Sequence, residues 1–130
     1  MHIKTGIDIV EVNRIRKDIE EFGNKFLNRI FTKEEIEYCE GKKVQKFQSY
    51  AGRFAAKEAI FKAISACIHN KYDVEWKDIQ ITNDKNGRPV VKIYGKLKEV
   101  LTVNCEIDVS ISHINETAVA SAVVELKKGM

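Results

Sequence analysis

The stretch YAGRFAAKEAIFKAI, residues 50–64, predicts one long helix around which the rest of the chain folds. Alanine and other good helix formers dominate it, and no proline interrupts it. At about 100° per residue, the large apolar side chains form one stripe: Phe47, Phe54, Phe61 and Ile68. The alanines form a second face that lets another backbone approach closely. Because both faces need partners, we expect this helix at the centre of the molecule.

The charged side chains of this helix do not gather on one solvated face, as they do on an ordinary surface helix. Arg53 and Lys57 fall on one side of the Phe stripe, and Glu58 and Lys62 fall between the stripe and the alanine face. We therefore expect Glu58 and Lys62 to be partly buried, which is costly unless a charge is paired or binds a ligand. Two interpretations stay open: a simple Glu58–Lys62 pair worth about 0.2–0.5 kcal/mol, or a ligand site.

Length and composition predict a single globular domain spanning residues 1–130. The chain is 44% apolar and 32% charged, which excludes a disordered protein. A net charge of +3 suits an anionic ligand or an acidic partner better than general nucleic-acid binding. The three cysteines follow no metal or disulfide pattern, so we expect the reducing cytoplasm. The sequence indicates neither a signal peptide nor a membrane span.

The remaining pattern predicts an α+β fold, with a mostly antiparallel sheet packed on the long helix. We expect strands at residues 3–12, 76–82, 88–94, 106–113 and 118–126, further helices from Asn13 and at 33–40 and 96–103, and a short turn or helix at 25–31. Residues 83–87, NDKNG, are a strong turn signal. Thr32 and Glu35 have the spacing of a capping box, which explains Glu35 without catalysis.

Asp8 is unusual because it shares a strand face with Val10 and Val12, and aspartate is disfavoured in strands. Together with Glu58 from another element, it could hold one magnesium ion, which proteins bind with one or two carboxylates, water and substrate phosphates. Cations of the long helix and a histidine at a strand end could then contact phosphates: Arg53, Lys57, Lys62 and His113. Such a set is what phosphoryl-type transfer requires.

The chain resembles the bacterial holo-acyl-carrier-protein synthases, a family of short phosphopantetheinyl transferases. The resemblance rests on GIDIVEVNRI (6–15), RIFTKEEIEYC (29–39), FAAKEAIFKAI (54–64), NDKNGRPVV (83–91) and VSISH (109–113). The spacing of G-x-D and F-x-x-K-E-x-x-x-K in so short a chain is quite specific. The resemblance implies transfer of phosphopantetheine from coenzyme A to a serine of apo acyl carrier protein, for fatty acid biosynthesis, with adenosine bisphosphate as the other product.

The same resemblance implies roles for single residues. Asp8 and Glu58 match the family's magnesium ligands, and Lys62 would stabilise or protonate the departing phosphate. The positions that match contacts to the coenzyme are Arg53, Lys57, Lys62, Ser112 and His113. Glu58, or Glu35 through a water molecule, could accept the serine proton, and the sequence does not choose between them.

The resemblance also implies partners and an assembly. Arg14 matches a position that meets the acidic carrier protein, and Lys25 or Arg29 would extend that patch. The family is trimeric, with each site shared between neighbouring subunits. One departure concerns Ser65, Ala66 and Cys67, which stand where the family usually has a Gly-rich turn. This departure puts the local phosphate contacts in question and suggests that the helix continues further.

The sequence is also compatible with two functions other than phosphopantetheine transfer. The first is a non-catalytic module that binds RNA or an acidic protein through its basic residues: Arg14, Lys25, Arg29, Lys42, Lys43 and Lys46. Against RNA, the sequence lacks the aromatic-rich sheet motif of an RNA-binding fold. The second is a magnesium-dependent phosphohydrolase that acts on a small nucleotide.

Overall fold

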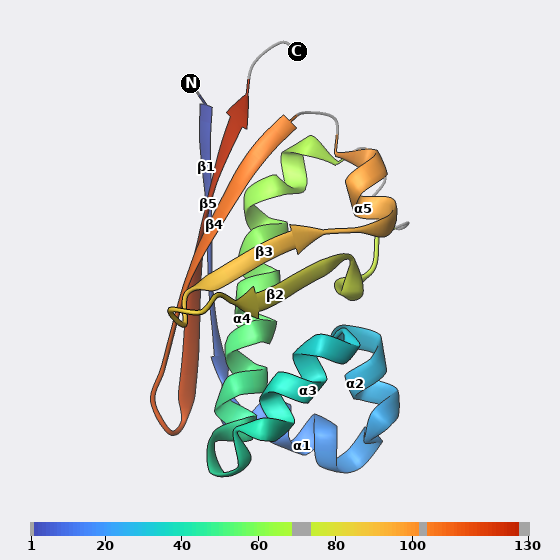
Figure 1. Cartoon of the computed structure of the whole chain (residues 1–130), viewed down its shortest axis with the longest axis vertical. Helices are drawn as coiled ribbons and strands as arrows, with labels where there is room; N and C mark the ends of the chain where they lie inside the picture. The colour runs from blue at the N-terminus through green and yellow to red at the C-terminus, as the bar shows by residue number, and fades with distance from the viewer. Residues whose placement is uncertain (1, 69–73, 102–103, 128–130) are drawn as a thin grey trace.

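The computed structural model describes residues 2–68, 74–101 and 104–127. Three strands form an antiparallel sheet in the order β1-β5-β4: β1 (His2–Glu11), β5 (Thr117–Lys127) and β4 (Asn104–His113). A separate antiparallel hairpin is made by β2 (Ile79–Asn83) and β3 (Pro89–Ile93). Figure 1 shows the three-stranded sheet along one side of a long helix, α4 (Lys46–Ile64). The expected α+β class is confirmed.

The other helices gather mainly at one end of α4, where Figure 1 shows α1, α2 and α3 side by side. Their bounds are α1 (Val12–Phe22), α2 (Asn24–Ile30) and α3 (Lys33–Gly41), and α5 (Gly95–Val100) follows the hairpin. Short 3₁₀ turns complete the described elements: η1 (Lys43–Gln45), η2 (Ser65–Cys67) and η4 (Trp76–Asp78). The expected extension of α4 is therefore a single 3₁₀ turn. Residues 69–71, 102–103 and 128–130, for which the sequence predicts a turn, a helix end and a tail, lie outside the described ranges.

One predicted strand begins too early, because residues 76–78 form a 3₁₀ turn and the strand starts at Ile79. Asp78 explains the difference, since its Oδ2 accepts the Glu75 amide at 3.1 Å and the Leu97 amide at 3.2 Å. These bonds favour a capped turn over an extended chain. At the start of α3, the predicted capping box is confirmed: the Glu35 amide donates to Thr32 Oγ1, and the Thr32 amide donates to Glu35 Oε1.

Small residues let α4 approach the sheet closely. A Cβ at Gly6 of β1 would lie 1.9 Å from the carbonyl oxygen of Ala59, and a Cβ at Gly52 would lie 2.8 Å from the Ile111 side chain of β4. The alanine face of α4 is completely buried at Ala51, Ala55 and Ala59. Helix α4 therefore crosses the sheet so that its middle lies against the edge strand β1 and its earlier turn lies against β4.

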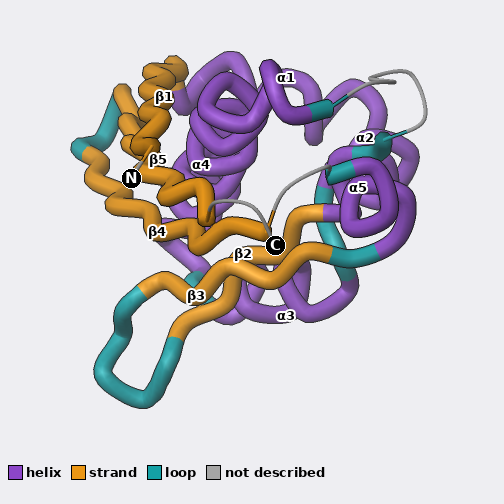
Figure 2. The backbone as a smooth tube through the Cα atoms, turned by 90° about the horizontal axis from the view of Figure 1, so that it is seen from above, coloured by secondary structure: helices purple, strands orange, loops and turns teal. Residues whose placement is uncertain are grey.

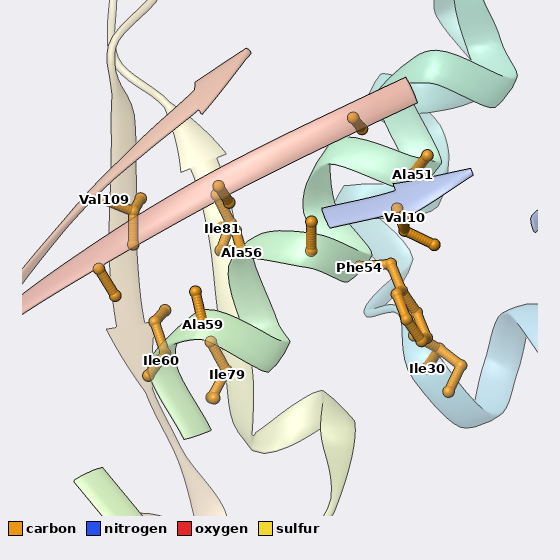
Figure 3. Packing of buried hydrophobic residues seen from close by; sticks show 14 of the residues in the cluster. Val10, Ile30, Ala51, Phe54, Ala56, Ala59, Ile60, Ile79, Ile81 and Val109 are labelled. Atoms are coloured by element: carbon orange, nitrogen blue, oxygen red, sulfur yellow. The ribbon is translucent and has the colours of Figure 1, made fainter. Parts of the chain in front are cut away.

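The core lies between α4 and its neighbours on all sides, as Figure 3 shows for side chains of the sheet, the hairpin and the helical end. The burial of charges on α4 agrees with the expectation only in part, because Glu58 is partly buried as expected and Lys62 is not. Arg53 is 5% exposed and Lys57 is completely buried, whereas Glu58 is half-buried and Lys62 is exposed. Arg53 and Lys57 lie on the side of α4 that the hairpin and α3 cover. Helical spacing alone does not predict this contact between distant segments of the chain.

In the part of the chain that the structure describes, no element covers the face of the three-stranded sheet that points away from α4, as Figure 2 shows from above. Because side chains alternate along a strand, Ile3, Ile7 and Ile9 of β1 point outward and are 55–68% exposed, and Val123 of β5 is 46% exposed. This outer face is an apolar patch on the surface. None of the helices in the described ranges has the length and apolar character that crossing a bilayer requires.

Candidate active site

Asp8 and Lys62 meet where the edge strand β1 runs beside α4. Asp8 lies on the inner face of the sheet in register with Ala120, and its side chain is 17% exposed. The ammonium of Lys62 lies 3.3 Å from Asp8 Oδ1 and donates to the carbonyl oxygen of Ile7 at 3.0 Å. Lys62 therefore connects the helix to the strand. The simplest interpretation of the sequence instead pairs it with Glu58 on the same helix.

Glu58 belongs to the same group of charges. Burial raises the pKa of its carboxyl group, and the nearby charge of Asp8 raises it further, whereas Lys62 and Arg14 act in the opposite direction. Three elements, β1, α1 and α4, thus bring two carboxylates and two cations together. The structure joins Asp8, Glu58 and Lys62 as the sequence predicts.

This donor set fits magnesium. Within the described residues, no group of three or more His, Cys, Asp or Glu side chains gathers as a complete metal cage. Magnesium does not need one, because it keeps several waters and substrate oxygens beside one or two carboxylates. Burial and the nearby Asp8 charge both oppose the ionised form of Glu58, and a divalent cation held by the two carboxylates would relieve this.

A pocket of about 450 Å³ opens next to Glu58, between α1, α2, α4 and η4. Aromatic side chains form its walls, and cations surround it: Phe22, Phe26, Phe54 and Trp76, with Arg14, Lys25 and Arg29. Phe54 and Trp76 stack at 5.0 Å between ring centres, and the guanidinium of Arg14 lies 5.6 Å from the centre of the Phe54 ring. The three predicted partner-binding cations therefore line one pocket. Sequence reasoning missed the aromatic walls, because their spacing does not distinguish them from core residues.

A groove of about 290 Å³ lies on the other side of α4, between the helix, the hairpin and the end of β4. Arg53 and His113 line it, together with Tyr38, Asn83 and Gly87. Sequence reasoning missed Tyr38 and gave Asn83 only a turn role. The predicted Ser112 is not part of the lining, and Ser110 and Ile111 of β4 form that wall instead.

Arg53 carries the charge of this groove. Its Nη2 donates to Asn83 Oδ1 at 2.5 Å and its Nη1 to Ser49 Oγ at 3.4 Å, and its guanidinium lies 4.1 Å from the centre of the Tyr38 ring. Among the described residues, no carboxylate forms an ion pair with Arg53, and its buried Nε has no hydrogen-bond partner. A buried cation without a counter-ion is costly, so the groove is suited to an anion.

Glu35 and Lys57 are not part of either cavity, which differs from the expected roles in catalysis and coenzyme binding. Both side chains are completely buried, with 2.7 Å between Lys57 Nζ and Glu35 Oε1. Burial lowers the pKa of the Lys57 ammonium, and the Glu35 carboxylate counteracts that effect. Both oxygens of Glu35 are occupied, because Oε1 also accepts the Thr32 amide and Oε2 accepts the Ile81 amide. Because the carboxylate is completely buried and both of its oxygens accept hydrogen bonds from the protein, the structure does not favour the expected role of Glu35 as a base that acts through a water molecule.

Comparison with known proteins agrees with this geometry. Residues 4–122 match the family model described as the 4′-phosphopantetheinyl transferase superfamily. A holo-[acyl-carrier-protein] synthase of Ruminiclostridium cellulolyticum is 45% identical over 128 residues, which cover 97% of this chain and 94% of that protein. The corresponding enzyme of Clostridium tetani is 42% identical over 128 residues, or 96% of this chain and 97% of that protein.

Solved structures extend the comparison to the fold. The holo-[acyl-carrier-protein] synthase of Helicobacter pylori in complex with coenzyme A superimposes with a TM-score of 0.79 at 32% identity, covering 93% of this chain and 99% of that chain. The enzyme of Bacillus anthracis in complex with CoA (3′,5′-ADP) gives 0.74 at 37% identity, with 93% and 94% covered. The chain therefore belongs to the 4′-phosphopantetheinyl transferase superfamily. Within that class, it is a member of the holo-[acyl-carrier-protein] synthase family.

Proposed function

We propose that this chain transfers phosphopantetheine from coenzyme A to a serine of apo acyl carrier protein, with a magnesium ion held by Asp8 and Glu58. The observation that carries the proposal is the meeting of Asp8, Glu58 and Lys62 beside the aromatic pocket, in a member of this family. The two carboxylates suit the metal and Lys62 suits a phosphate. We place the reaction in the cytoplasm, in support of fatty acid biosynthesis.

The chemistry follows from the positions of the side chains. Magnesium, when bound, would supply neutralisation of the pyrophosphate charge. The serine hydroxyl attacks the phosphorus that carries the pantetheine, and the bond from that phosphorus to the bridging oxygen breaks. Glu58 accepts the hydroxyl proton, because of the two candidate bases only Glu58 lines a cavity. Lys62 stabilises the charge that develops on the departing adenosine bisphosphate.

The groove at Arg53 and His113 would bind the adenosine bisphosphate part of the coenzyme. Its unpaired buried cation supports an anionic ligand there. We leave Lys57 out of the phosphate contacts because its ammonium is fully bonded in the interior. Ser112 stays a prediction, since it lies on the outer face of the sheet and would need a ligand that approaches from that side.

A trimer would bring the two halves of the site together. Helix α4 separates the Arg53 groove, on its β4 side, from Asp8 and Glu58, on its β1 side. One coenzyme molecule would then contact the groove of one subunit and the carboxylates of its neighbour. The exposed apolar side chains of the outer sheet face support such an association.

The carrier protein would dock at the pocket beside Glu58. Arg14, Lys25 and Arg29 line that pocket, and they complement an acidic partner. Charge complementarity of this kind mainly speeds encounter. The same arrangement places the acceptor serine next to the carboxylates.

Intact-mass spectrometry of apo acyl carrier protein tests the proposed function. With coenzyme A, magnesium and this protein, the carrier gains one phosphopantetheine, and excess chelator prevents the gain. Carrier binding that persists in chelator with no product at any magnesium concentration would instead support the binding module. Release of free phosphopantetheine without any acceptor would support the phosphohydrolase.

A further inference from the structure

A buried ion pair joins five segments of the chain. Lys57 Nζ donates to Glu35 Oε1 at 2.7 Å, to the carbonyl oxygen of Ile30 at 2.7 Å and to that of Trp76 at 3.2 Å. Glu35 accepts the amides of Thr32 and Ile81, both at 2.8 Å. The pair thus ties together the end of α2, the start of α3, the middle of α4, η4 and β2.

One set of these contacts holds the pocket beside Glu58. Ile30 and Trp76, whose carbonyl oxygens accept from Lys57, both line that pocket from opposite segments. Trp76 in turn stacks on Phe54, and Phe61 contacts it edge-on at 5.8 Å between ring centres. Lys57 therefore fixes two backbone walls of the pocket without reaching into it.

The other set holds the groove on the far side of α4. Glu35 Oε2 accepts the amide of Ile81, and two residues further along β2, Asn83 holds the guanidinium of Arg53. Arg53 lies one helical turn before Lys57 on α4. The position of β2 against α3 thus sets where the Arg53 guanidinium lies in the groove.

Stability alone is a poor explanation for this pair. Removing two charges from water is expensive, and a buried pair is often no more stable than apolar residues of similar volume. Its geometric consequence is different, because charge-assisted hydrogen bonds fix direction as well as distance. We propose that Glu35 and Lys57 are positioning residues that fix the walls of the carrier-side pocket and of the coenzyme groove, the two half-sites that one chain contributes. This inference rests on the proposed function.

The test is the double variant Glu35→Gln, Lys57→Met, which removes both charges and keeps similar volumes. It leaves no unpaired charge at the place of the ion pair, so we expect it to fold. The carbonyl oxygens of Ile30 and Trp76 lose their donor, so the walls shift by a fraction of an ångström to an ångström. A displacement of that size lowers a transfer rate by about ten- to a hundredfold, measured as kcat per folded molecule. The emission of Trp76, the chain's only tryptophan, shifts as well.

Glu35→Gln alone provides an independent second test. A glutamine keeps one acceptor for Lys57 but presents an amide group to the Ile81 amide, so β2 and the Arg53 groove move. We expect KM for coenzyme A to rise at least about fivefold while KM for the carrier changes less than twofold. The matched control is Glu99→Gln, Lys96→Met, an exposed pair on α5 at 4.0 Å, which leaves both parameters unchanged.

Wild-type kcat and KM values in both folded variants would overturn the inference. A loss of activity that equals the loss of folded protein would overturn it as well. If the wild-type protein transfers nothing while Trp76 emission still shifts in the double variant, the positioning stands and the proposed function fails. Urea unfolding of each variant, followed by circular dichroism, supplies the folded fraction.

Discussion

At the scale of single residues, Glu58 has an environment that opposes its ionised form. Burial and the Asp8 charge raise its pKa, so protonation of Glu58 is more favourable in the folded protein than in the unfolded chain. The stabilisation from that proton is complete below the unfolded pKa of about 4.5 and is lost as pH rises through the higher folded pKa. The ionised carboxylate that forms as pH rises is therefore unfavourable in the metal-free protein, and the proposed metal ion would offset that cost.

We predict that Glu58→Gln stabilises the metal-free protein at neutral pH and removes this pH dependence, while transfer falls by more than about a hundredfold. Urea unfolding between pH 4 and 8 and the transfer assay measure the two effects. The matched control is Glu37→Gln, an exposed carboxylate on α3, which leaves both unchanged. A destabilised but active Glu58→Gln protein would contradict both the electrostatic and the catalytic role.

The prediction for Lys62 is different, because its ammonium acts on the negative charge that develops on the leaving group during the reaction. Lys62→Met is expected to lower kcat by about 10²–10³-fold with a much smaller change in KM for coenzyme A. Steady-state kinetics separate the two, with the exposed Lys96→Met on α5 as control. A pure rise in KM would show that Lys62 binds the ground state instead.

At the scale of elements, the contact between β1 and α4 decides whether the two carboxylates meet. A Cβ at Gly6 would clash with the Ala59 carbonyl, and backbone on both sides leaves little room to adjust. We predict that Gly6→Ala lowers the free energy of unfolding by at least about 3 kcal/mol, measured by urea titration. Gly41→Ala, where a Cβ meets nothing within 4 Å, is the control and is expected to change stability by less than about 1 kcal/mol. Equal stability of the two variants would contradict this packing.

The sequence predicts most elements because the decisive signals are local. The alternation in residues 106–113 and the capping box at Thr32 specify their own structure. The burial of Arg53 and Lys57 depends instead on partners far along the chain, Asn83 and Glu35, which no helical period reveals. For the same reason, the sequence could predict that Asp8, Glu58 and Lys62 belong to one site. It could not show that Glu35 and Lys57 form a buried pair outside that site.

At the scale of the whole molecule, the outer face of the sheet is an apolar surface that a single chain exposes to solvent. Ile9→Lys places a charge there, 68% exposed in the single chain, without touching the core. We predict that it shifts the protein from a trimer to a 14.9 kDa monomer in sedimentation equilibrium and abolishes transfer. Tyr94→Lys, at an exposed apolar side chain outside the three-stranded sheet, retains both the assembly and the transfer activity. A fully active Ile9→Lys monomer would contradict a site shared between subunits.

The most direct test of the account is a titration with Mn²⁺, a spectroscopic substitute for magnesium, followed by electron paramagnetic resonance. We predict one binding site per chain in the wild-type protein, displaced by Mg²⁺ and lost in both Asp8→Asn and Glu58→Gln. Unchanged stoichiometry and affinity in both variants would show that the strand aspartate and the helix glutamate do not share a metal ion.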